Sequence, residues 1–126
     1  MSKVKPRFGP GVIGEYAEKG ERLAVECMKQ INDAEIAGLK LAGELDALAE
    51  RICYLIGTGQ VATDQEQMSI TIDRTTRHLL MLNDLRIRRA VAYGNLLLTL
   101  GQEEVAVLLD KNPPIDVTEH HGIEEE

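Results

Sequence analysis

The residues best suited to chemistry in this sequence are arginines that lie close together and could hold phosphate groups. Asp73 and Asp84 precede Arg77 and Arg88 by four residues, which is the spacing and order of favourable helical ion pairs. A solvated, salt-bridged helix face is therefore the simpler interpretation of this cluster, although guanidinium groups bind phosphate oxygens well. The cluster consists of Arg74, Arg77, Arg86, Arg88 and Arg89.

Nucleic acid is an alternative partner, because Arg74, Arg77 and Arg88 fall on one side of the predicted helix. A basic N-terminal arm, residues 1–12, would add phosphate contacts through Lys3, Lys5 and Arg7. The whole chain has a net charge of −7, and residues 101–126 contain eight acidic residues and one basic residue. The average attraction to polyanions is therefore weak, and an aromatic content of 3% gives no platform for stacked bases.

Catalytic and metal-binding motifs are scarce. The sequence has two serines, Ser2 and Ser69, and it lacks a glycine-rich phosphate loop, CxxC, HExxH and a nucleophile elbow. His120 and His121 are adjacent, but no second ligand pair at helical spacing supports a metal site. We therefore predict a non-enzymatic protein without a cofactor or metal, with a helical-bundle enzyme or metal carrier as a further alternative.

The first long element is a helix predicted over residues 13–56, where no proline occurs. Asn32 followed by Glu35 could instead cap a new helix start, so a break near Asn32 is the alternative. Gly57 and Gly59 predict the end of this helix. Apolar or small residues recur in alternating steps of three and four, namely Ala17, Gly20, Ala24, Cys27, Ile31, Ala34, Gly38, Leu41, Leu45, Leu48, Ile52 and Leu55.

A second helix is predicted over residues 64–100, with Thr63 and Glu66 as its capping box. A short third helix follows over 102–110, and residues 112–126 form an acidic extended tail. The folded domain is thus expected over residues 13–111. The apolar stripe of the second helix is predicted to contain Met68, Ile72, Thr75, Leu79, Leu82, Ala90, Tyr93, Leu97 and Leu100.

These elements predict an all-α protein, a long antiparallel helical hairpin with a small third helix. The apolar faces are too wide for two helices to cover, so we expect a homodimer that forms a four-helix bundle or coiled-coil-like assembly. Small residues at four-residue steps, Ala34, Gly38 and Ala42, would allow a close helix crossing at the dimer axis.

Arg86 falls at the centre of the predicted stripe of the second helix and requires an acidic partner there. If the hairpin turns near residue 60, residue i faces residue 121 − i, which places Glu35 opposite Arg86. We predict an Arg86–Glu35 ion pair, within or between chains, that fixes the register of the helices.

The C-terminal segment Pro113-Pro114-Ile115-Asp116-Val117 is typical of a docking peptide for a partner with a basic groove, although a solubilising tail is the simpler interpretation. Cys27 and Cys53 are too far apart on one helix for a disulfide, and no signal peptide or membrane span is predicted, so we expect a cytoplasmic protein. The predicted function is a homo-oligomeric adaptor or accessory protein that acts on an unidentified protein partner.

Overall fold

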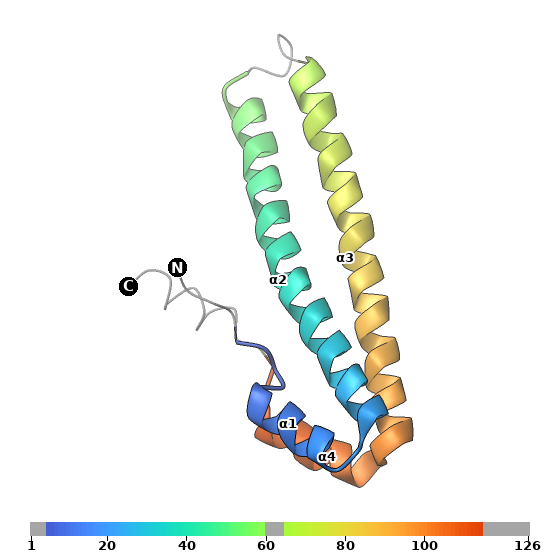
Figure 1. The fold of residues 1–126 in the computed structure, drawn as a ribbon. Helices are drawn as coiled ribbons and strands as arrows, with labels where there is room; N and C mark the ends of the chain where they lie inside the picture. Colours follow the sequence, from blue (N-terminus) through green and yellow to red (C-terminus); the bar gives the residue numbers. More distant parts are fainter. Residues whose placement is uncertain (1–4, 60–64, 115–126) are drawn as a thin grey trace, which may run out of the picture.

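The computed structural model describes residues 5–59 and 65–114, and the described chain is an antiparallel hairpin of long helices closed at one end by two short ones (Figure 1). The long helices are α2 (Arg22–Gly57) and α3 (Gln65–Leu100), each of 36 residues and therefore about 54 Å long. The short helices, α1 (Pro10–Glu18) and α4 (Gln102–Lys111), lie across the base of the hairpin. The predicted all-α hairpin with a short C-terminal helix is confirmed.

The apolar stripe of α2 packs against α3 as the sequence predicts. Every stripe residue from Ala24 to Leu55 is buried or half-buried, and the alternating steps of three and four keep one narrow face toward α3. The helix continues through Asn32 without interruption.

The chain breaks earlier, at residues 19–21, where the sequence analysis expected one continuous helix. Gly20 has φ +78°, a left-handed conformation that glycine adopts without steric penalty. The N–H groups of Gly20 and Glu21 donate to the carbonyls of Ala17 and Tyr16, which closes the end of α1. Because the chain turns here, α1 crosses the base of the hairpin instead of extending α2.

Helix α3 is rotated relative to the sequence prediction. Ile72, Leu79 and Leu97 were placed in its core stripe and are exposed. Met68, Thr75, Leu82, Tyr93 and Leu100 of the predicted stripe are half-buried as predicted. On the side toward α2, Thr71, His78, Leu85, Ala92 and Leu96 are also buried or half-buried.

Polar residues can occupy this inward face because their polar groups are satisfied. The hydroxyls of Thr71 and Thr75 donate to carbonyls four residues back on α3, each at 2.8 Å. His78 Nε2 lies 2.7 Å from a carboxylate oxygen of Glu44 on α2. The desolvation penalty that usually keeps polar residues out of a helix interface is therefore largely removed.

The hydrophobic core lies at the base of the hairpin, where all four helices meet. Phe8 is completely buried in this core, packed with residues from every helix. The side-chain amide of Asn32 accepts a hydrogen bond from the Phe8 N–H at 2.9 Å and donates one to the Phe8 carbonyl at 2.8 Å. Part of the segment 1–12, which was expected to be a basic arm, is thus folded into the body. Lys3 lies outside the described residues.

We expect Phe8→Ala to lower the free energy of unfolding by about 3–5 kcal/mol, because it removes a fully buried aromatic side chain and leaves a cavity. Urea unfolding followed by circular dichroism measures the change. Ile56→Ala, at an exposed aliphatic residue near the end of α2, is the control and should change stability by less than about 1 kcal/mol. Equal losses in the two variants would contradict the burial of Phe8.

Candidate functional site

The most unusual surface of the molecule is an apolar ridge on the side of α3 that faces away from α2. We call Leu80, Ile87, Val91 and Leu98 the α3 outer face. Their exposed fractions are 66%, 55%, 56% and 87%. At 100° per residue the four side chains fall within an arc of about 40°, opposite Leu96 of the core.

The residues of the outer face are separated by seven, four and seven positions, which is the heptad spacing of residues that pack against another helix. The sequence pattern does not predict this ridge, because the charged residues on that side of the helix are typical of a solvated face. Those charged residues, such as Arg77 and Arg88, flank the ridge and do not cover it. The sequence feature that could have predicted the ridge is the repeated heptad spacing of these large aliphatic residues.

An open groove of about 500 Å³ lies beside the outer face, between α2 and α3. Ile87 and Val91 form its wall on α3, and Ala37 contributes from α2. Because two residues of the outer face also line the groove, the ridge and the groove make one continuous apolar surface.

The arginines predicted to bind phosphate lie on α3, and two of them are engaged by acids. Arg88 pairs with Asp84 at 2.9 Å, and Arg77 pairs with Asp73, so both helical ion pairs predicted from the spacing are confirmed. Arg74 and Lys5 are exposed. Arg7, expected to assist them from the N-terminal arm, is held inside the fold.

Arg7 forms a half-buried polar cluster that joins the N-terminal segment to three helices. Its Nε donates to the carbonyl of Asn112 at 2.8 Å, and its Nη1 donates to Tyr93 Oη at 2.6 Å. Tyr93 in turn donates to Glu35 Oε2 at 3.1 Å, and Arg7 Nη1 lies 3.7 Å from the same oxygen. The side chains of Arg7 and Glu35 are only 11% and 9% exposed, so this pair is shielded from water.

Glu35 therefore pairs with Arg7 in the chain, where the sequence analysis predicted Arg86. Arg86 is exposed, lines the same groove as Glu35, and forms no ion pair with any described residue. The rotation of α3 moves Arg86 to the edge of the interface, and Arg7 takes its place beside the carboxylate. An Arg86–Glu35 ion pair between two chains stays a prediction.

The predicted hairpin register agrees with the observed contacts. Glu44 meets His78, and a Cβ on Gly38 would lie 3.8 Å from Leu82 Cδ1, close to the rule that paired residue numbers add to about 121. That distance is an ordinary contact, so Gly38 faces Leu82 without an unusually close backbone approach. Ala34 is buried between the helices and Ala42 is exposed.

The remaining candidate residues add little chemistry to the described chain. No group of three His, Cys, Asp or Glu within residues 5–59 and 65–114 could hold a metal ion, and His120 and His121 lie outside these ranges. Cys27 is buried, Cys53 is exposed, and both thiols are free. Pro113 and Pro114 are exposed, whereas Ile115 and Val117 lie outside the described residues.

No protein-family model, curated protein or solved structure matches the chain. None of the described helices combines the length and apolar composition needed to cross a membrane.

We expect the folded chain to lose stability between pH 10 and 12, because the folded state holds two phenol protons more tightly than the unfolded state. Burial and the negative charge of Glu35 raise the pKa of Tyr93 to about 12. Burial and the hydrogen bond to Glu104 likewise raise the pKa of Tyr16 to about 12. The unfolded chain releases these protons near pH 10, so their contribution to stability is complete below pH 10 and disappears as the pH rises to 12.

Urea unfolding across this pH range, with tyrosinate absorbance recorded in parallel, measures the loss. Tyr93→Phe should reduce the pH dependence and remove the corresponding late ionisation. An unchanged pH dependence in Tyr93→Phe would show that Tyr93 ionises with the same pKa in both states.

Proposed function

We propose that the protein is a non-enzymatic helical hairpin that self-associates through the α3 outer face and acts by protein–protein contact. The observation that carries the proposal is the exposure of four large aliphatic residues at heptad spacing on one side of α3. Full burial of one such side chain contributes about 1.5–3 kcal/mol, so covering the ridge on both protomers is a substantial driving force. Contiguous apolar surface of this kind is typical of an interaction site.

The spacing of the ridge favours a second copy of the chain as the partner. Positions 80 and 98, and positions 87 and 91, are symmetric about residue 89. In an antiparallel pair of α3 helices, Ile87 would therefore meet Val91 of the partner subunit, and Leu80 would meet Leu98 of the partner subunit. A two-fold axis repeats both contacts, which is how a self-complementary interface is built.

The one polar position within the ridge also fits antiparallel pairing. Asp84 would lie opposite Gly94 of the partner subunit, which has no side chain to compete for the space. Asp84 keeps its ion pair with Arg88 at the rim of the interface. A single polar layer of this type favours one register over the alternatives.

The structure offers less support for nucleic-acid binding. Of the three arginines in the predicted phosphate-binding face, Arg77 and Arg88 are in ion pairs with neighbouring acids. Both pairs are well exposed, so they could open with little penalty, but none of the three arginines is a buried cation that would select a phosphate group. DNA binding that disappears in Arg74→Ala/Arg77→Ala would favour this alternative over self-association.

Absolute mass in solution tests the proposal directly. Static light scattering of the wild-type chain should give about twice its mass of 13.9 kDa, with little dependence on salt. Ile87→Asp should give the mass of one chain with unchanged helicity, because the two-fold axis places two new carboxylates in one apolar interface.

Leu79→Asp is the matched control, since Leu79 is 54% exposed and Ile87 is 55% exposed on the same helix, but Leu79 lies outside the ridge. This variant should keep the mass of the dimer. A monomeric wild-type chain, or equal masses for the two variants, would contradict the proposal.

A further inference from the structure

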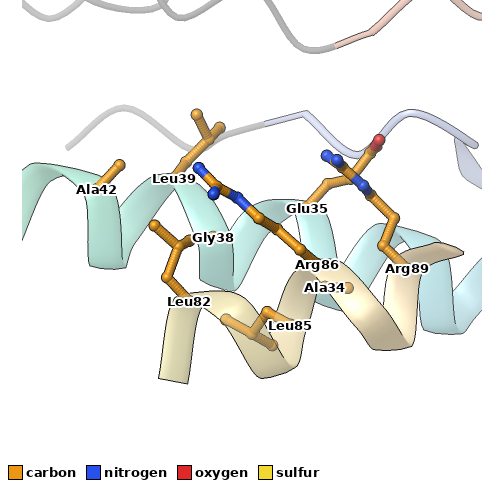
Figure 2. A pocket seen from close by; sticks show the side chains of 9 residues that line it. All are labelled: Ala34, Glu35, Gly38, Leu39, Ala42, Leu82, Leu85, Arg86 and Arg89. Atoms are coloured by element: carbon orange, nitrogen blue, oxygen red, sulfur yellow. The ribbon is translucent and has the colours of Figure 1, made fainter. Parts of the chain in front are cut away.

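A second groove lies between α2 and α3 on the side of Glu35, and its charges are unbalanced. We call it the Arg86 groove; it holds about 180 Å³. Figure 2 shows Arg86 and Arg89 extending across it from α3, with the Arg86 guanidinium toward Leu39 and the Arg89 guanidinium toward Glu35. The residues that line it are Ala34, Glu35, Gly38, Leu39, Ala42, Leu82, Leu85, Arg86 and Arg89.

The two arginines of the groove have no acidic partner in the described chain. Neither Arg86 nor Arg89 forms an ion pair with residues 5–59 or 65–114, and the nearest lining carboxylate, Glu35, is already paired with Arg7. Glu35 Oε1 is also buried without a hydrogen-bond donor, although the Glu35 side chain is only 9% exposed. The two arginines therefore suit a ligand that brings carboxylates to the rim of the groove.

The C-terminal end of the described chain leaves the fold beside this groove. The carbonyl of Asn112 accepts a hydrogen bond from Arg7, and Arg7 contacts Glu35 in the groove wall. From Ala34 to Ala42 the groove follows α2 for about 12 Å. An extended chain advances about 3.3 Å per residue, so four or five of the residues after Pro114 are enough to cover it.

We propose that residues 115–119 of the same chain, Ile-Asp-Val-Thr-Glu, occupy the Arg86 groove as an extended segment. Ile115 and Val117 are two residues apart, so they share one side of the segment and can pack on the apolar lining of the groove. Asp116 and Glu119 bring carboxylates to Arg86 and Arg89.

This arrangement assigns the sequence-predicted docking peptide to a site within its own chain. Because the segment is covalently attached to the folded chain, its effective concentration at the groove is high, and tight intrinsic binding is not required. An external acidic peptide would then compete with residues 115–119 for the same arginines. The inference does not depend on self-association, because the Arg86 groove and the α3 outer face lie on different sides of α3.

Paramagnetic broadening in the full-length chain tests the proposal. A nitroxide label is attached to Gly122→Cys in a Cys53→Ser background. Cys27 stays in place because it is buried and burial raises the pKa of its thiol, which slows labelling. We expect a strong loss of amide signal intensity at Leu39, Ala42 and Arg86, and a smaller loss at Ala37 and Val91 beside the groove on the opposite side of the hairpin.

Charge reversal provides the matched pair of variants. Arg86→Glu/Arg89→Glu should restore the signals of the Arg86 groove, whereas Arg74→Glu/Arg77→Glu, two exposed arginines outside it, should leave the broadening in place. Unaltered helicity of both variants in circular dichroism would exclude unfolding as the cause of the restored amide signals. Absent broadening, equal broadening on both sides of the hairpin, or broadening that survives Arg86→Glu/Arg89→Glu would overturn the proposal.

Mixing isotope-labelled chains without nitroxide and unlabelled chains with nitroxide separates the two possible sources of the segment. The proposal predicts no broadening in the mixture, because the segment binds its own chain. Broadening at the Arg86 groove in the mixture would assign the occupant to a partner subunit and overturn the intramolecular assignment.

Discussion

Two antiparallel helices cover only one side of each other, and the properties of this molecule follow from that constraint because α3 carries large aliphatic residues on two sides. Helix α2 directs one apolar stripe toward α3, which covers it, and keeps Leu23, Tyr54 and Ile56 exposed. Helix α3 turns toward α2 a face that includes Thr71, Thr75 and His78. Its more apolar positions, Leu80, Ile87, Val91 and Leu98, are left in contact with solvent. The hairpin therefore covers the apolar stripe of α2 and leaves an exposed apolar surface on α3 against which a further helix can pack.

The base of the hairpin supplies the rigidity that this arrangement needs. Phe8, anchored by Asn32, fills the space where the four helices meet, and Arg7 links Glu35, Tyr93 and Asn112 across the same end. Toward the hairpin turn, the buried residues within 5–59 and 65–114 are sparse: Leu41, Leu55 and Thr71. Packing is therefore concentrated at the base, and the α3 outer face, from Leu80 to Leu98, lies along the half of α3 that leads to this base. Glu35 of the polar cluster also lines the Arg86 groove, so the cluster at the base and the groove share this residue.

The sequence predicts those features of the fold that depend on local pattern. The heptad stripe of α2, the helix end at Gly57, the short helix α4 and the pairing of residues near a sum of 121 all follow from spacing and turn chemistry. The features that depend on long-range contacts were not predictable in this way. Gly20 resembles any other small residue of the stripe until the chain turns there, and Phe8 has no periodic neighbours that mark it as core. Arg7 is 28 residues from Glu35, and its burial depends on α1 folding back. The rotation of α3 was missed because the hydrogen bonds that make Thr71 and His78 compatible with the interface involve the backbone and Glu44, which hydrophobic periodicity does not report.

The central claim is that the α3 outer face pairs with itself in an antiparallel orientation, and the distance between identical positions on two chains tests it most directly. Thr76 is exposed and lies 13 residues from the symmetric point at residue 89. A spin label at Thr76→Cys in a Cys53→Ser background should give an interchain electron–electron distance of about 40 Å, since the two labels lie on opposite sides of the axis at 1.5 Å per residue. A distance of about 10 Å, the separation of parallel packed helices, would show that the orientation is wrong. The absence of any interchain coupling at concentrations well above those of the mass measurement would contradict self-association itself.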